Sequence, residues 1–221
     1  MTNFQIDIVS DTVCPWCHVG NQRLKKAIEI YRSRHPDSKD TFSTTWYPFY
    51  LNPASPKHGV DKAAFYRSKF GDERTSMIFR HLTNVGHEVG IKFAFGGKTG
   101  NTRDSHRLIQ LAKTKGSEMQ TKVVEELFAR YFEKEQDITS KDMLLDAGVK
   151  AGLPEKEVKE WLDSDKGGKE VDREVMEAQM KEISGVPNFT FQGKYEMGGA
   201  QDPEEFVQVF EKVRKMEGAN A

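Results

Sequence analysis

The chain has 221 residues, enough for one medium-sized domain or for a core domain with a large insertion. Its 33 Lys and Arg residues nearly balance its 34 Asp and Glu residues, and the net charge of −1 gives no overall attraction to nucleic acid or anionic membranes. No stretch approaches the roughly 20 apolar residues that cross a bilayer. The first residues also lack the basic start and apolar run of a secretory signal. We therefore expect a cytoplasmic protein with no nucleic-acid or membrane partner.

The first elements that the sequence predicts are a strand, a helix and a second strand. Apolar and polar residues alternate over residues 4–9, which is typical of a β-strand. Between Pro15 and Pro36 apolar residues recur at helical spacing, and the helix has to end before the second of these prolines. Residues 41–50 are rich in Thr and aromatic side chains and predict another strand. This order indicates a β-α-β unit, whose parallel strands need a crossover helix.

Helical patterns dominate from about Asp61 to Ile183, and almost no β-rich run interrupts them. Met176 and Met180, four residues apart, are expected to lie in the core or to line a groove. We interpret residues 56–183 as an all-helical insertion domain. The predicted helices span residues 63–70, 73–85, 103–115, 118–133, 154–162 and 169–183, with another near 140–145.

The last part of the chain returns to strands. Residues 188–191 predict a short strand, and residues 192–194 predict a hairpin turn into a second strand. Asp202 followed by Pro203 and two glutamates is typical of a helix start. The overall order is therefore β-α-β, a helical insertion, and β-β-α.

The two cysteines of the chain stand in one motif, Cys14-Pro15-Trp16-Cys17, where the first strand hands over to the first helix. At a helix N-terminus a cysteine meets unpaired N–H groups and the positive end of the helix dipole, which favour the thiolate. The second cysteine, about one turn on, can close an internal disulfide. Pro15 suits the first helical turn, and Trp16 either lines a substrate surface or packs against neighbouring loops.

Three other interpretations of this motif remain open at the level of sequence. A buried, unreactive cysteine pair is the simplest of them. The run Cys14-Pro15-Trp16-Cys17-His18 also satisfies the pattern of c-type haem attachment, but no export signal accompanies it. A zinc site would have to recruit His18 or distant His, Asp or Glu residues, since a closed structural site takes four ligands. We predict no metal site.

A second motif, Gly185-Val186-Pro187-Asn188-Phe189, precedes the first late strand. A proline that enters a strand removes a hydrogen-bond donor and marks an edge or a special geometry. If the Val186–Pro187 bond is cis, the backbone groups of Val186 turn outward and can pair with an extended thiol substrate.

Together these motifs resemble the thioredoxin superfamily, and the long helical insertion resembles its DsbA branch. Further segments are similar to the FrnE-like group, which is related to kappa-class glutathione transferases and 2-hydroxychromene-2-carboxylate isomerases. The resemblance implies an α/β thioredoxin-like fold, with a thioredoxin-like domain at 1–55 and 184–221 that the helical domain at 56–183 interrupts. The segments that carry this similarity are residues 11–17, Pro48-Phe49-Tyr50-Leu51-Asn52-Pro53, Asn101-Thr102 with His106-Arg107-Leu108, and Gly198-Gly199-Ala200-Gln201.

The resemblance also implies roles for single residues. Cys14 would be the nucleophile, Cys17 the resolving thiol, and Pro187 a cis proline facing them. Val186 would offer backbone hydrogen bonds to a bound peptide or glutathione cysteine. Kappa transferases carry a serine-type residue at the position of Cys14, and a Ser-Asp pair near Ala200 that grips glutathione. Because this chain departs at both places, redox exchange is favoured over conjugation.

The remaining candidates for substrate contact are Asn52, His106, Ala200 and Gln201, beside Pro15 and Trp16. Asn52 is by default a turn residue before a proline, and His106 is by default a hydrogen-bonded packing residue, with lining of the active cleft as the alternative. We predict a thiol-disulfide oxidoreductase that acts on protein or small-molecule disulfides, with no tightly bound cofactor and glutathione as a candidate co-substrate. The first alternative is a glutathione-dependent transferase or isomerase acting on a small aromatic or polyketide-derived substrate. The second is a non-catalytic thiol- or metal-binding stress protein.

Overall fold

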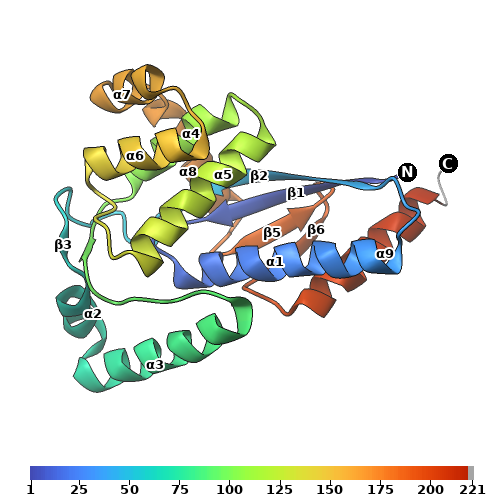
Figure 1. Ribbon diagram of the computed structural model, residues 1–221, viewed down its shortest axis with the longest axis horizontal. Helices are drawn as coiled ribbons and strands as arrows, with labels where there is room; N and C mark the ends of the chain where they lie inside the picture. The colour runs from blue at the N-terminus through green and yellow to red at the C-terminus, as the bar shows by residue number, and fades with distance from the viewer. Residues whose placement is uncertain (219–221) are drawn as a thin grey trace.

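A four-stranded mixed sheet forms the centre of the molecule in the computed structural model, which describes residues 1–218 (Figure 1). The strand order is β2-β1-β5-β6, with β1 parallel to β2 and antiparallel to β5, and β5 antiparallel to β6. The predicted strands and their order are confirmed. The bounds are Asn3–Ser10 for β1, Thr41–Pro48 for β2, Asn188–Phe191 for β5 and Tyr195–Gly198 for β6.

Helices α1 (Pro15–Arg34) and α9 (Pro203–Gly218) pack against each other and against the sheet. Aromatic side chains fill this layer, because alternate strand residues turn their rings toward the helices. The Phe4 ring of β1 lies 5.2 Å from the ring of Tyr31 in α1 and 5.2 Å from that of Phe210 in α9. The last helix begins at Pro203, as predicted.

The helical region between β2 and β5 is confirmed as an insertion. In Figure 1, α2 and α3 lie on one side of the central sheet and α7 lies on the opposite side. The helices of this region are α2 (Lys62–Phe70), α3 (Asp72–Val89), α4 (Arg103–Lys113), α5 (Ser117–Phe128), α6 (Lys141–Ala151), α7 (Glu155–Asp163) and α8 (Gly168–Met180).

Three details of the insertion differ from the sequence-based expectation. A two-residue ribbon pairs β3 (Val60–Asp61) with β4 (Lys98–Thr99), although no strand was predicted there. The helix predicted through residue 133 ends at Phe128 and continues as a π-helical turn, Ala129–Glu133. Met176 and Met180 are 56% and 84% exposed, so their predicted burial is wrong. α8 turns Val171, Val175 and Ala178 inward instead.

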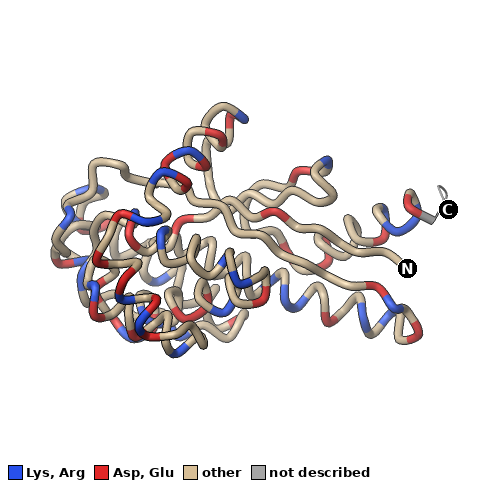
Figure 2. The backbone as a smooth tube through the Cα atoms, turned by 90° about the horizontal axis from the view of Figure 1, so that it is seen from above, with Lys and Arg blue, Asp and Glu red and all other residues tan. Residues whose placement is uncertain are grey.

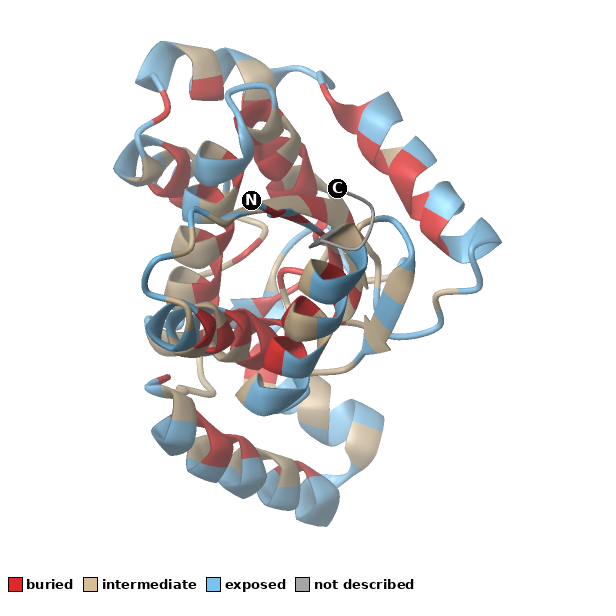
Figure 3. Ribbon diagram, turned by 90° about the vertical axis from the view of Figure 1, so that its right-hand side faces the viewer, coloured by how far each residue is buried: buried red, intermediate tan, exposed pale blue. Residues whose placement is uncertain are grey.

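A buried glutamine fastens the insertion to the edge of the sheet. The side chain of Gln120 in α5 accepts a hydrogen bond from the Trp46 N–H (2.9 Å) and donates one to the Trp46 carbonyl (2.8 Å). These bonds occupy backbone groups that an edge strand would otherwise leave open. One continuous hydrophobic core runs from the sheet into α4–α7, and the buried residues meet there in Figure 3. The domain limits at 55/56 and 183/184 stay a prediction.

Charged residues are distributed over the whole molecule. Basic and acidic positions alternate along the helices, and neither sign gathers on one region of the tube (Figure 2). Within residues 1–218, no helix has the length and apolar character required to cross a bilayer.

Candidate active site

Cys14 occupies the N-cap of α1, directly after the loop that leaves β1. Its backbone N–H donates to the Asp11 carbonyl (3.0 Å), and its own carbonyl accepts from the Cys17 N–H (3.1 Å). The Cys14 thiol is 3.5 Å from the Val186 carbonyl oxygen, to which it donates. The loop before β5 is thereby brought against the start of α1, although the two lie far apart in sequence.

Cys17 lies one turn further along α1, beneath Cys14. Both cysteines are free thiols, and Cys17 is 1% exposed. Burial raises the pKa of the Cys17 thiol well above its ordinary value. The hydrogen bond that Cys17 donates to Cys14 and the negative charge of the Cys14 thiolate raise this pKa further. Cys17 is therefore protonated at neutral pH.

The Val186–Pro187 peptide bond is cis. The cis geometry that the resemblance implies is thus present, whereas the pairing of Val186 with an extended thiol substrate stays a prediction. Val186 and Cys14 share one wall of a cavity. Gly20 of α1 lies close to Pro187: a Cβ atom there would come within 3.1 Å of the Pro187 ring and of Phe189. Glycine therefore allows α1 to approach the loop that faces Cys14.

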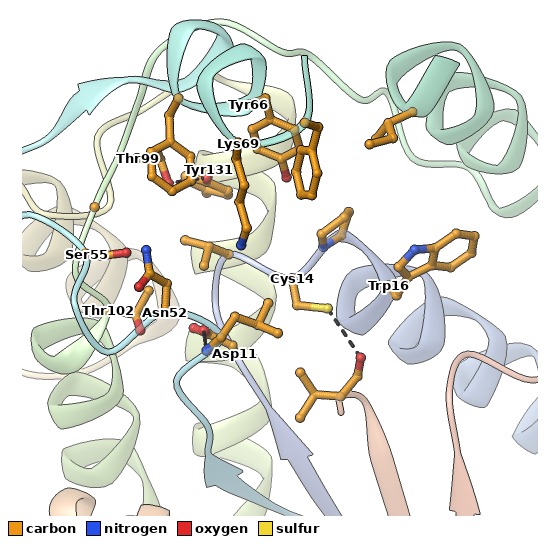
Figure 4. Close-up of a pocket in the computed structure, with 18 of the residues that line it drawn as sticks. Asp11, Cys14, Trp16, Asn52, Ser55, Tyr66, Lys69, Thr99, Thr102 and Tyr131 are labelled. Atoms are coloured by element: carbon orange, nitrogen blue, oxygen red, sulfur yellow. Dashed lines mark hydrogen bonds between the residues drawn. The ribbon is translucent and has the colours of Figure 1, made fainter. Parts of the chain in front are cut away.

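A cavity of about 350 Å³ opens beside Cys14 (Figure 4). One wall comes from the thioredoxin part, and the opposite wall comes from α2, α3 and the turn around β4. Most of the lining is apolar or aromatic, as in other small-molecule sites. Its lining residues are Asp11, Val13, Cys14, Pro15, Trp16, Leu51, Asn52, Ser55, Phe65, Tyr66, Lys69, Phe70, Ile78, Leu82, Thr99, Gly100, Thr102, Tyr131 and Val186.

Asp11 is a buried carboxylate on the wall of this cavity. Its Oδ2 accepts a hydrogen bond from the Leu51 N–H at 2.8 Å. The other oxygen, Oδ1, has no hydrogen-bond partner among residues 1–218 and lies 3.4 Å from Nε2 of His106. The same Nε2 is 3.2 Å from the Phe49 carbonyl. Asp11 therefore fixes the loop after β2 against the loop that carries Cys14.

His18, next to Cys17, is also buried and pairs with a carboxylate. Its Nε2 lies 3.2 Å from Oε1 of Glu133, and its Nδ1 has no hydrogen-bond partner in the described part of the chain. The hydrogen bond from His18 is the main cause that holds the pKa of the Glu133 carboxyl below its ordinary value. Glu133 ends the π-helical turn, a distortion that is often found at functional sites.

The π-helical turn also carries Tyr131, which lines the cavity. The Tyr131 hydroxyl donates to Thr99 Oγ1 (2.8 Å), and the Lys62 ammonium donates to the Tyr131 carbonyl (2.7 Å). Burial lowers the pKa of Lys62 to about 8. These bonds fix one wall of the cavity to α2 and to the β3–β4 ribbon.

Half of the ten predicted site residues line this cavity: Cys14, Pro15, Trp16, Asn52 and Val186. Trp16 contacts α3 as well, with its ring 5.6 Å from that of His81. Cys17 and Pro187 lie behind the wall. Their catalytic roles, and the contacts of the five lining residues with substrate, stay predictions.

The other three predicted contacts lie outside the cavity lining. His106 is 4% exposed and stands behind Asp11, in accord with its default interpretation as a packing residue. The Ala200 carbonyl accepts a hydrogen bond from Arg23 (2.6 Å), and the Gln201 amide donates to the Gly198 carbonyl (2.7 Å). The structure therefore does not bring these three residues together with Cys14 in one cavity.

Sequence reasoning missed the wall that the insertion supplies. The sequence pattern predicts a helix over residues 63–70 but assigns it no part in the site. Four of its residues lie on one helical face, because they are separated by one, three and one positions: Phe65, Tyr66, Lys69 and Phe70. A largely aromatic face on a short helix was the available signal. Its position opposite Cys14 depends on tertiary structure that the pattern does not contain.

No group of three or more His, Cys, Asp or Glu side chains within residues 1–218 is arranged to hold a metal ion.

A cysteine pair at the start of the helix after β1, opposite a cis proline on a βαβ…ββα sheet, defines a thioredoxin-fold protein. The family model of the DSBA-like thioredoxin domain matches residues 5–211. The chain therefore belongs to this family, whose members are thiol oxidoreductases.

Solved structures with the same fold include oxidoreductases and an isomerase. A probable DsbA oxidoreductase from Streptomyces coelicolor is 26% identical, with a TM-score of 0.84 over 96% of this chain and 90% of the other. A 2-hydroxychromene-2-carboxylate isomerase is 13% identical, with a TM-score of 0.71 over 98% of this chain and 99% of the other. The cytosolic disulfide reductase DsbM from Pseudomonas aeruginosa, solved with glutathione, is 13% identical, with a TM-score of 0.63 over 96% of this chain and 99% of the other. Comparison of the sequence with curated proteins gives no match.

Proposed function

We propose that the protein is a thiol-disulfide oxidoreductase with Cys14 as nucleophile and Cys17 as resolving thiol. The position of Cys14 carries this proposal: the residue occupies the N-cap of α1, its thiol lies on the wall of a cavity, and a second thiol lies one helical turn behind it. Both cysteines are buried, but of the two only Cys14 belongs to the cavity lining.

The proposed reaction begins when the Cys14 thiolate attacks one sulfur of a substrate disulfide. A Cys14–substrate disulfide forms, and the other half of the substrate leaves as a thiolate. Cys17 then loses its proton, attacks the Cys14 sulfur and releases the second thiolate. Two electrons pass to the substrate, and the Cys14–Cys17 disulfide remains. In the reverse direction the oxidised protein takes two electrons from a substrate dithiol.

The raised pKa of Cys17 assigns the two steps to different thiols. A protonated Cys17 does not compete with Cys14 for the incoming disulfide. Once Cys14 is in a mixed disulfide it no longer carries a negative charge, so one of the causes that raise the pKa of Cys17 is removed. The second step thus becomes easier after the first.

We further propose a cytoplasmic location and glutathione as the thiol that reduces the Cys14–Cys17 disulfide. The fold shared with the cytosolic disulfide reductase DsbM, solved with glutathione, motivates both statements. Two glutathione molecules would supply the two electrons and leave as oxidised glutathione.

The proposed exchange is tested with single cysteine variants and a disulfide substrate. Cys14→Ser is expected to lose all turnover, whereas Cys17→Ser is expected to stop at a mixed disulfide that mass spectrometry detects. The midpoint potential of the wild-type pair in a glutathione redox buffer sets the direction. Appreciable exchange by Cys14→Ser would contradict the proposal.

A second candidate function is supported by the cavity itself. A largely apolar and aromatic cavity of about 350 Å³ suits a small molecule, and the isomerase among the structural neighbours has the same fold. A glutathione-dependent transferase or isomerase would keep its activity in Cys17→Ser. The third candidate, a thiol- or metal-binding stress protein, requires stoichiometric metal on the purified chain and no turnover of disulfides.

A further inference from the structure

The cavity beside Cys14 has two charged side chains in its lining, Asp11 and Lys69. Asp11 is 1% exposed and is engaged with the Leu51 N–H and with His106. Lys69 is exposed, and within residues 1–218 its ammonium group makes no ion pair. In Figure 4 its side chain extends from α2 into the space beside Cys14. Lys69 is therefore the charge that remains available to a ligand.

The same face of α2 supplies aromatic surface on both sides of this charge. Phe65, Tyr66 and Phe70 line the cavity together with Ile78 and Leu82 of α3. The Lys69 ammonium lies 5.4 Å from the centre of the Phe70 ring, which keeps the side chain along the aromatic wall. A ligand in this cavity meets an apolar surface for its body and a cation for an acidic group.

We propose that the cavity selects small disulfides with an aromatic or apolar body and a carboxylate, and that Lys69 binds the carboxylate. This inference rests on the proposed exchange at Cys14, because the selected molecule is the disulfide that Cys14 attacks. One half of the substrate joins Cys14, the other half leaves as a thiolate, and attack by Cys17 releases the first half. Two molecules of a monothiol such as glutathione then return two electrons to the protein and leave as the oxidised disulfide.

The position of the charge also orients the substrate. The Asp11 carboxylate repels another carboxylate. Because Asp11 lies on the same wall as Cys14, the acidic end of a substrate is disfavoured along that wall. Lys69 comes from the opposite wall and attracts the acid there. The disulfide sulfurs then lie on the side of Cys14, and the apolar part of the substrate packs against Phe65 and Phe70.

Two aromatic disulfides of different charge test this selection. The anionic probe is 5,5′-dithiobis(2-nitrobenzoate), and the uncharged probe is 4,4′-dithiodipyridine. Each is mixed with prereduced protein without added thiol, because glutathione reacts with both probes directly, and the second-order rate constant of the first exchange gives kcat/KM. Lys69→Met is expected to lower kcat/KM for the anionic probe by about three- to fivefold, the upper part of the range for an exposed ion pair. The value for the uncharged probe should stay within about twofold. Lys69→Arg should restore most of the loss.

Lys159→Met serves as the matched control. Lys159 is an exposed residue of α7, which lies on the other side of the molecule from α2 (Figure 1), so the variant removes the same charge at a distance. It should leave both probes unchanged. Equal losses for both probes in Lys69→Met, or no loss for either, would overturn the assignment of Lys69.

A binding measurement separates this inference from the proposed exchange. In Cys14→Ser protein, 4-nitrobenzoate should bind more tightly than uncharged 4-nitrobenzyl alcohol, as followed by quenching of tryptophan fluorescence, and Lys69→Met should abolish the difference. If the wild type reduces neither disulfide but this preference is present, the exchange fails and the selection stands. If the preference is absent, the selection is wrong whatever the exchange does.

Discussion

The thioredoxin part and the helical insertion contribute different properties to one cavity. The thioredoxin part supplies Cys14, Cys17 and Val186, which are the groups expected to react with or hold the disulfide. The insertion supplies the facing wall, with Tyr66 and Lys69 of α2. Under the proposed function, the reacting groups come from the junction of a strand and a helix, and the groups that select the substrate come from the insertion.

The two regions are stabilised in a similar way. The core is continuous between them, and Gln120 closes the edge of the sheet with two hydrogen bonds. A cavity that lies between two regions requires them to keep a fixed relation. The following predictions test how far the regions are separable.

The largest loss of stability is expected when a large core side chain is removed from either region. Phe128 of α5 and Phe206 of α9 are both 0% exposed. Replacement of either by alanine should lower the free energy of unfolding by about 3–5 kcal/mol. Because the core is continuous, each variant should unfold in one transition when followed by circular dichroism and by tryptophan fluorescence. Two separate transitions in Phe128→Ala would show that the insertion folds independently.

A smaller loss is expected from Arg107, which acts within the insertion alone. This side chain of α4 is 2% exposed and donates to the carbonyls of Trp161, Ser164 and Lys166 at the end of α7. Arg107→Met removes the hydrogen bonds of this buried guanidinium group to three carbonyls and should lower the free energy of unfolding by about 2–4 kcal/mol in urea titrations.

Arg107→Lys is the matched control, because it keeps the charge but loses the planar group that reaches several carbonyls at once. It should retain only part of the stability. A full rescue by lysine would mean that the charge matters and the hydrogen bonds do not.

The thioredoxin part is stabilised by a comparable group of hydrogen bonds around Asp40, and their contribution to the free energy of unfolding depends on pH. Asp40 accepts hydrogen bonds from the Thr2 N–H (2.6 Å) and the Tyr31 hydroxyl (2.7 Å). Burial raises the pKa of this carboxyl. The two bonds, a third that the Ser38 side chain donates, and the nearby charge of Arg214 outweigh burial and lower the pKa to about 2, from an ordinary 3.8. The stabilisation is present above about pH 4 and is lost as the pH falls toward about 2.

Asp40→Asn removes the charge while keeping an oxygen acceptor. We expect the wild type to be more stable than this variant by about 1–2 kcal/mol near neutral pH, and the difference to close as the pH falls from about 4 to about 2. Thermal unfolding over that range measures it. A difference that does not depend on pH would contradict the proposed origin.

The sequence predicted the thioredoxin part more completely than the insertion, and particular residues explain why. The cysteine motif, the proline at 187 and the alternating residues of β1 each specify local geometry, which the structure contains as expected. Met176 and Met180 were misjudged because helical spacing shows that two residues share a face but not which face is covered. Tyr66 and Lys69 meet Cys14 only because the chain folds back after β2. That relation is tertiary, and no local pattern expresses it.

The smallest effect is expected from the Tyr66 hydroxyl, which belongs to the insertion but is influenced by the thioredoxin part. Burial raises the pKa of Tyr66 to about 12, and the negative charge of Cys14 contributes to the rise. The hydroxyl therefore stays protonated throughout the neutral range and can donate a hydrogen bond to a sulfur that carries negative charge. Tyr66→Phe should lower kcat/KM by about two- to fivefold, the value of one hydrogen bond.

This loss should be the same for the anionic and the uncharged disulfide, unlike the loss in Lys69→Met, because the hydroxyl is expected to act on sulfur and not on the carboxylate. The pH profile below about pH 10 should keep its shape, since Tyr66 does not ionise there. Tyr195→Phe, which alters a tyrosine of β6 outside the cavity lining, is the control and should leave both rates unchanged. If Tyr66→Phe instead changed the preference between the two probes, α2 would select substrates through its hydroxyl as well as its ammonium group, and the separation between reactivity and selectivity would not hold at this residue.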